Sequence, residues 1–255
     1  MQPSTGWKRG CAWQPTPRRE KEDQSVRIGI IAALNEEIEP LLLCMEGAET
    51  TKWGRRRSHQ GRIGTCEVVA MVSGVGKVKA AACTQYLIDR FSVEAVICTG
   101  VAGAVNPELQ TGDVVVSQKS LEHDFDPGDP KLLKRLRRRW LVADAELVEL
   151  ALEAAREVSL GDRCRAGKVL TGDQAIVSRE RREWLWKTFR AECVDMESAA
   201  VAQVCRLNEL PWVAVRAISD SAEEDGVAEF RKNLDRTAKA AARVVEKLVN
   251  LMGTA

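Results

Sequence analysis

The stretch Cys193-Val194-Asp195-Met196-Glu197-Ser198-Ala199-Ala200 decides how this chain can fold. It joins a short apolar run to a helical run, after which the apolar residues 212–218 end in Ser219-Asp220. An apolar run, a helix and a second apolar run predict a parallel crossover between two buried strands. In sheets of that kind, ligands bind beyond the carboxyl ends of the strands. We therefore expect the carboxylates of Glu197 and Asp220 to face one cavity.

Asp195 and Glu197 lie on either side of Met196 but support different interpretations. An acidic residue just before a helix is most often a helix cap, which is the plain interpretation of Asp195. Glu197 begins the helix itself, and the small residues that follow it let the helix lie close to the sheet. The positive end of the helix dipole would also favour its carboxylate. Glu197 is therefore the stronger functional candidate.

The length and composition of the chain limit the classes of protein to which it can belong. A chain of 255 residues, 45% of them hydrophobic, can bury a sizeable core. Its 38 basic and 37 acidic residues give no global argument for binding nucleic acid or a membrane. Residues 1–25 lack apolar periodicity, so we expect a disordered N-terminal extension before a single domain over residues 26–255. No run is long enough for a membrane span, and the expected partner is a small molecule.

The cysteines and histidines indicate the cellular compartment. The eight cysteines form no CxxC pair, and several lie in apolar runs. This usage is typical of reduced, mostly buried thiols in a cytoplasmic protein. His59 and His123 are too isolated to build a usual metal centre, so we expect no bound metal. A histidine between acids could relay protons, but His123 fits better as a strand-end residue held by hydrogen bonds.

The first predicted strand, residues 26–33, leads into Leu34-Asn35-Glu36-Glu37. Asn35 can cap the following helix, and an acidic first turn opposes the helix dipole. Glu37 is kept as a functional candidate.

Two segments of small residues follow later predicted strands. Ser73-Gly74-Val75-Gly76-Lys77 precedes a helix over residues 77–91, and Gly100-Val101-Ala102-Gly103-Ala104 follows a strand over residues 95–99. The first segment fits neither a Walker loop nor a dinucleotide fingerprint, because Val78 and Lys79 stand where those motifs need Ser or Thr and Gly. Each segment suits a turn, for tight packing or for contact with a ligand.

Residues 131–140 contain six basic residues. A polyanion site is one interpretation, but a solvated helix or loop with an apolar anchor is commoner.

Together these motifs resemble the nucleoside phosphorylase superfamily over about residues 26–251, and within it the 5′-methylthioadenosine/S-adenosylhomocysteine nucleosidases. Each motif is weak alone, and their order and spacing carry the resemblance. The motifs are Gly29-Ile30-Ile31-Ala32-Ala33-Leu34-Asn35-Glu36-Glu37, Ser73-Gly74-Val75-Gly76-Lys77, Thr99-Gly100-Val101-Ala102-Gly103, Thr171-Gly172-Asp173, Val194-Asp195-Met196-Glu197 and Ala217-Ile218-Ser219-Asp220.

The resemblance implies a three-layer α/β/α sandwich around a mixed, partly barrel-like sheet, commonly in a homodimer. It implies hydrolysis of the N-ribosidic bond of a purine nucleoside, without a cofactor. Such a reaction needs an acid for the leaving purine, a base for water and negative charge beside the ribosyl cation.

The resemblance also implies residue roles. Asp220 would protonate purine N7 with Ser219 orienting it, and Glu37 would activate water. Glu197 would bind the ribose hydroxyls, with Met196 packed beneath the sugar. The remaining implied substrate contacts are Leu34, Val75, Val101, Ala102, Gly103, Ile176 and Phe230. Arg216 fits either a pair with a nearby carboxylate or a structural role.

Departures from the family leave alternatives open. Val101 stands where the family often has Ser, and Ala175 where an aromatic residue stacks on the purine. The acidic loop at residues 34–37 replaces the phosphate loop of the phosphorylases and favours water as nucleophile. A phosphorylase, a nucleosidase for another modified purine nucleoside, as in hopanoid or menaquinone synthesis, and a non-catalytic nucleoside sensor are the rival functions. Nucleic-acid binding through residues 131–139 is a further, weaker one.

Overall fold

The computed structural model describes residues 26–136, 139–223 and 225–254. The expected N-terminal extension lies outside these residues, so the division of the chain at residue 25 stays a prediction. The strands are β1 (Arg27–Ala32), β2 (Glu46–Trp53), β3 (Arg56–Ile63), β4 (Cys66–Val72), β5 (Ala95–Ala104), β6 (Val114–Glu122), β7 (Leu141–Val142), β8 (Cys164–Thr171), β9 (Cys193–Asp195) and β10 (Trp212–Asp220). The helices are α1 (Asn35–Leu43), α2 (Lys77–Phe91), α3 (Pro130–Leu136), α4 (Ala145–Glu157), α5 (Arg179–Phe189), α6 (Ser198–Leu207) and α7 (Gly226–Met252).

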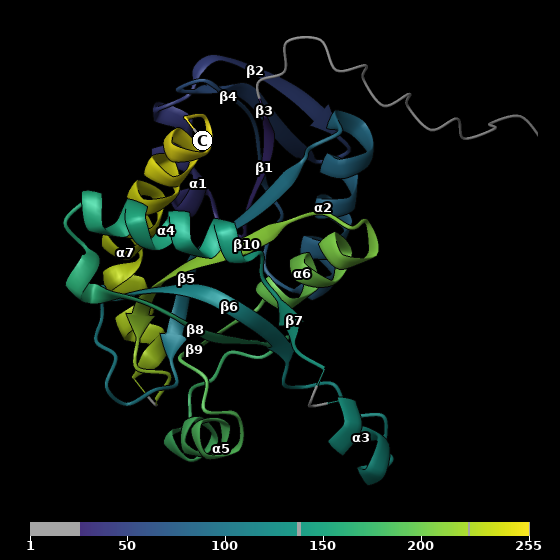
Figure 1. Cartoon of the computed structure of the whole chain (residues 1–255). Coiled ribbons are helices and arrows are strands. Elements are labelled where there is room, and N and C mark those ends of the chain that lie inside the picture. The colour runs from purple at the N-terminus through teal and green to yellow at the C-terminus, as the bar shows by residue number, and fades with distance from the viewer. Residues whose placement is uncertain (1–25, 137–138, 224, 255) are drawn as a thin grey trace, which may run out of the picture.

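The strands form one mixed sheet that is partly closed (Figure 1). β5 pairs with β1 and β10 in parallel and with β9 in antiparallel orientation. From β5, the strands β9, β8, β6 and β10 return to β5 and close a five-stranded barrel, while β1, β4, β3 and β2 extend as an open sheet. β1, β5 and β10 are buried along nearly their whole length, as expected of strands covered on both faces. The predicted barrel-like sheet is confirmed.

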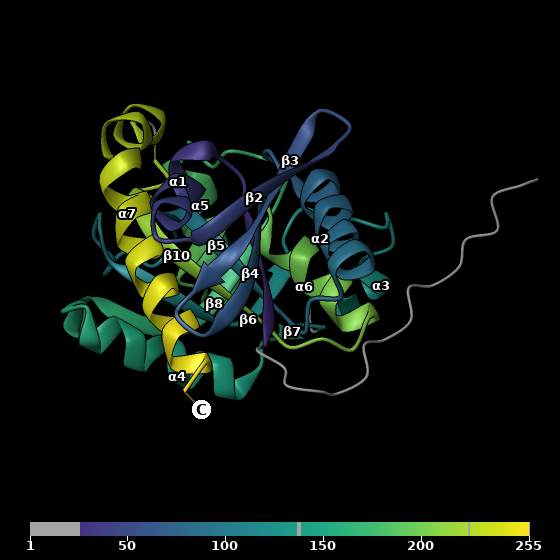
Figure 2. The ribbon, with the colours of Figure 1, turned by 90° about the horizontal axis from the view of Figure 1, so that it is seen from above.

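Helices cover both sides of the sheet and complete the predicted sandwich (Figure 2). α7 packs on β5 and β10 and lies beside α1 and α4, whereas α2 packs against α6 on the other side. α5 closes one end of the barrel through an apolar cluster that includes Leu170, Leu185 and Val194. α3 carries part of the basic run, contains no buried residue and projects from the body (Figure 1), so the predicted solvated helix is confirmed for its described part. No helix in the described ranges has the length and apolarity that crossing a membrane requires.

The parallel crossover predicted around Glu197 is wrong. β9 and β10 lie on opposite sides of β5 and run in opposite directions, because β9 is antiparallel to β5 and β10 is parallel to it. A run of buried apolar residues has the same pattern in either direction, so strand direction cannot be read from it. The two acids still meet, since Gly103 pairs with Val194 on one side and with Asp220 on the other.

The turn predicted at residues 100–104 is also wrong, because β5 continues to Ala104. Its small residues pair with β10 as far as Gly103 and Asp220. The glycines there serve close approach by neighbouring side chains, which a sequence pattern cannot distinguish from a turn.

Candidate active site

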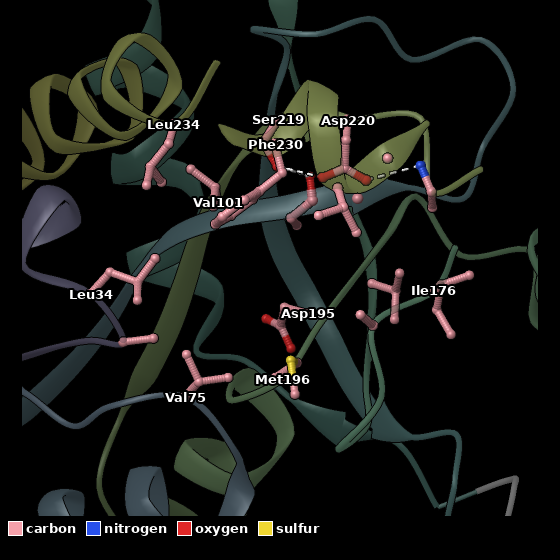
Figure 3. A pocket seen from close by; sticks show the side chains of 18 of the residues that line it. Leu34, Val75, Val101, Ile176, Asp195, Met196, Ser219, Asp220, Phe230 and Leu234 are labelled. Carbon is pink, nitrogen blue, oxygen red and sulfur yellow. Dashed lines mark hydrogen bonds between the residues drawn. The ribbon is translucent and has the colours of Figure 1, made fainter. Parts of the chain in front are cut away.

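A cavity of about 510 Å³ opens where the second half of β5 meets β9 and β10 (Figure 3). Its lining includes all twelve residues that the sequence proposed for the site. These are Leu34, Glu37, Val75, Val101, Ala102, Gly103, Ile176, Met196, Glu197, Ser219, Asp220 and Phe230.

Glu37 reaches the cavity from the first turn of α1 and is 2% exposed. Its Oε2 accepts hydrogen bonds from the backbone N–H groups of Ala33 (2.8 Å) and Leu34 (2.9 Å), and its Oε1 accepts one from Val101 (2.9 Å). Burial raises the pKa of Glu37, while the Arg216 charge and these three donors partly oppose the rise. Glu37 is therefore the carboxylate that accepts the backbone N–H groups just before α1. The predicted cap at Asn35 is wrong, because Leu34 occupies the N-cap position.

Glu197 stands at the N-cap of α6, lines the cavity and lies beside Gly76, the N-cap of α2. Its Oε1 accepts a hydrogen bond from the backbone N–H of Gly76 at 2.9 Å, and its Oε2 lies 3.8 Å from Arg216 Nη2. Burial raises the pKa of Glu197 to about 7, with Asp195 and Glu37 adding to the rise and Arg216 opposing it. The Glu197 carboxyl group therefore accepts a proton more readily than that of a free glutamate.

Asp220 ends β10 and is held by its neighbours (Figure 3). Its Oδ2 lies 2.7 Å from Ser219 Oγ, and its Oδ1 accepts a hydrogen bond from the backbone N–H of Ala222 at 2.9 Å. Burial raises the pKa of Asp220, and these two donors oppose the rise. The orienting contact that the resemblance implies for Ser219 is present.

Arg216 is paired with a carboxylate. It is 1% exposed, and its Nε lies 2.8 Å from Asp195 Oδ2 and donates to Ser198 Oγ at 3.1 Å. Its Nη2 donates to Cys98 Sγ at 2.9 Å. Burial lowers the pKa of Arg216, but the surrounding carboxylates raise the pKa by more than burial lowers it. The guanidinium therefore stays charged. Asp195 also accepts the N–H groups of Glu197 and Ser198 at 3.2 Å, so it caps the helix and binds the cation at once.

Gly100 leaves the space in which Glu37 and Arg216 approach each other. Its φ of +151° disfavours other residues, and a Cβ there would lie 2.4 Å from Glu37 Oε1 and 2.6 Å from Arg216 Nη1. A side chain at this position would separate the two charged groups.

Comparison with known proteins now identifies the family. The phosphorylase superfamily profile matches residues 27–250. The chain belongs to this superfamily.

Its relatives in the superfamily include nucleosidases of two kinds. A 5′-methylthioadenosine/S-adenosylhomocysteine nucleosidase from Geobacillus kaustophilus is 36% identical over 89% of this chain and 98% of that protein. An aminodeoxyfutalosine nucleosidase from Campylobacter jejuni is 32% identical over 88% of this chain and 98% of its own length. Among solved structures, a 5′-methylthioadenosine/S-adenosylhomocysteine nucleosidase from Neisseria meningitidis in complex with methylthio-immucillin-A has a TM-score of 0.83 at 33% identity, covering 88% of this chain and 99% of that one.

The site of this superfamily member contains residues that sequence reasoning missed. Val227 and Leu234 line the cavity beside Phe230, at spacings of three and four residues on one face of α7. The apolar spacing of residues 229–251 predicts a helix that begins at Glu229, whereas α7 begins at Gly226, so this prediction leaves out the first turn. Helical spacing extended one turn upstream of Glu229 would have found Val227.

His123 does not have the hydrogen bonds predicted for it. It is 3% exposed, and neither ring nitrogen has a hydrogen-bond partner among the described residues. Its ring packs against Gly172, where a Cβ would lie 2.3 Å from Nε2. His123 is absent from the cavity lining, so we assign it no role in the site.

We predict that Gly100→Ala destabilises the protein through the site. Steric overlap with Glu37 and Arg216 should lower the free energy of unfolding by about 1–3 kcal/mol more than a glycine substitution in open space. The matched control is Gly54→Ala, which also has a positive φ (+56°) but no atom within 4 Å of its Cβ. Chemical denaturation of both variants measures the difference, and equal losses would contradict the crowding at Gly100.

Proposed function

We propose that this chain hydrolyses the N-ribosidic bond of a purine nucleoside. The observation that carries the proposal is the meeting of Glu37, Glu197 and Asp220 in one cavity, each with different hydrogen-bond donors. Carboxyl groups in different environments can divide the work of acid, base and charge stabilisation. The similarity to nucleosidases of the superfamily supports the same reaction.

Asp220 is suited to donate a proton to N7 of the purine. Burial keeps its carboxyl group protonated at higher pH than a free aspartic acid, and Ser219 and Ala222 fix its direction. When the C1′–N9 bond breaks, its electron pair passes to the purine ring, and the proton from Asp220 makes that ring a better leaving group.

Glu37 and Glu197 are suited to the ribose side of the reaction. Glu37 would take a proton from the water that attacks C1′, because three backbone N–H groups and Arg216 favour its ionised form. Glu197 would accept hydrogen bonds from the ribose hydroxyls, and negative charge there stabilises the cationic transition state. Water adds its hydroxyl to C1′, and the products are free base and free sugar.

The lining favours an uncharged 5′ substituent. Leu34, Val75 and Leu234 lie on one side of the cavity, away from Ile176 (Figure 3). Glu36, which also lines the cavity, adds negative charge. A 5′-methylthio group gains from apolar contact, whereas the zwitterionic tail of S-adenosylhomocysteine must lose hydration there. We therefore place 5′-methylthioadenosine ahead of S-adenosylhomocysteine as the substrate.

Apolar side chains around the opening support a homodimer. Val177 and Val227 line the cavity yet are 41% and 46% exposed, and a second copy of the chain would cover them. Sedimentation equilibrium should then give twice the chain mass of 28.2 kDa. A single-chain mass at micromolar concentration would contradict the dimer.

Incubation with 5′-methylthioadenosine in phosphate-free buffer tests the reaction. We expect free adenine and free methylthioribose without added phosphate, because Glu36 and Glu37 place negative charge where a phosphate nucleophile would bind. S-adenosylhomocysteine, aminodeoxyfutalosine and unmodified adenosine complete the substrate panel. Strict dependence on phosphate would support a phosphorylase, and binding without turnover across the panel would support a nucleoside sensor.

Asp220→Asn should lower the rate of purine release by about 10²- to 10⁴-fold, because the amide cannot donate the acid proton. Asp225→Asn is the matched control, since Asp225 is exposed and its side chain makes no cap hydrogen bond. Circular dichroism should show both variants folded. Turnover of Asp220→Asn at the control rate would remove Asp220 as the acid.

A further inference from the structure

Three carboxylates lie near Arg216, but they do not contact it equally. Its Nε is 2.8 Å from Asp195 Oδ2, whereas its Nη2 is 3.8 Å from Glu197 Oε2. Within the described residues no ion pair joins Arg216 to Glu37, although both groups border the space at Gly100. Arg216 thus makes its close contact with Asp195, a carboxylate that has no role in the proposed reaction.

Asp195 is built to hold that cation in place. Its Oδ1 lies 2.6 Å from Thr171 Oγ1 and accepts the two N–H groups at the start of α6. Its Oδ2 faces Arg216 Nε and Ser198 Oγ. With both oxygens fixed from different elements, Asp195 cannot turn away from Arg216.

We propose that Asp195 is a positioning residue that withholds Arg216 from the two working carboxylates, Glu37 and Glu197. This inference rests on the proposed hydrolysis. If Arg216 paired closely with Glu37 or Glu197, its charge would make Glu37 a weaker base or neutralise Glu197 beside the ribosyl cation. The contact with Asp195 keeps Arg216 charged and close to Glu37 and Glu197, but prevents it from forming a close ion pair with either of them.

Arg216 is the positively charged side chain that acts on both Glu37 and Glu197. Glu197 faces Arg216, Asp195 and Glu37, and accepts the Gly76 N–H at the start of α2. Glu37 faces Arg216 and three backbone N–H groups. Lys77, the next residue of α2, directs its ammonium group to Glu122 (3.2 Å) and Asp124 (2.7 Å) instead.

Asp195→Asn tests the proposal with little change of shape. The amide oxygen can still accept from Thr171 and the α6 N–H groups, but its NH₂ would face Arg216 Nε, donor against donor. The released guanidinium should move toward Glu197 and Glu37 and favour their ionised forms, and loss of the Asp195 charge, which raises the pKa of Glu197, acts in the same direction. The acid limb of the pH profile of kcat/KM, where a working carboxylate becomes protonated, should therefore shift to lower pH by about 1 to 3 units.

Thr171→Val is the matched control for a structural effect. It removes the hydroxyl that contacts Asp195 but leaves the Asp195 charge and its pairing with Arg216. We expect its acid limb to coincide with that of the unaltered protein. An unmoved or raised limb in Asp195→Asn, or an equal shift in Thr171→Val, would overturn the proposal.

A titration of the unaltered protein covers the case in which Asp195→Asn does not fold. Carbon-13 NMR of labelled glutamate, with the signal assigned through Glu197→Gln, should show Glu197 titrating near neutral pH. If Glu197 stays ionised below about pH 4, as expected of a carboxylate in a close pair with Arg216, the proposal fails. This measurement needs no turnover, so its failure is separate from the failure of the proposed hydrolysis, which is absence of purine release.

Discussion

The site depends on one buried cation. An unpaired guanidinium inside a protein costs several kcal/mol, so Arg216 requires carboxylates in fixed positions around it. Asp195 comes from β9, Glu197 from the start of α6 and Cys98 from β5, while Arg216 itself lies on β10. These elements come together only when β9 and β10 flank β5 and the barrel closes. The cavity therefore exists only where the barrel is closed.

The small residues of β5 make room for this arrangement. Glu37 reaches Val101 N–H through the space that Gly100 leaves open, and Asp220 lies where a Cβ on Gly103 would be 2.9 Å from its Oδ1. The two carboxylates thus approach the same strand from α1 and from β10. A larger residue at either glycine would hold a carboxylate away from the cavity, so the two glycines of β5 are what let the acidic side chains converge.

Local features of this chain could be predicted from sequence, and relations between distant segments could not. Helix α2 follows from the helix predicted over residues 77–91, and the hairpin of β3 and β4 follows from β-rich runs at residues 55–60 and 67–73 on either side of the turn at Gly61 and Gly64. The cavity lining followed from motifs carried over by resemblance. The direction of β9 and the extension of β5 depend on which strands pair, and burial hides that from a one-dimensional pattern. Strand β2 was missed because its side chains are mostly exposed and polar. The unequal sharing of Arg216 is a matter of distances, which no spacing of residues encodes.

The division between acid and base follows from the donors around each carboxyl group rather than from residue type. An apolar cavity raises the pKa of every carboxyl group in it, which helps an acid and hinders a base. At Glu37, three backbone N–H groups and a nearby cation partly offset this rise. Asp220 has a serine hydroxyl and one N–H, and no ion pair among the described residues. A nucleoside that fills the cavity displaces water from both groups and strengthens this contrast, because the donors stay in place while solvent leaves. The same apolar lining therefore selects the substrate and sets the charges that act on it.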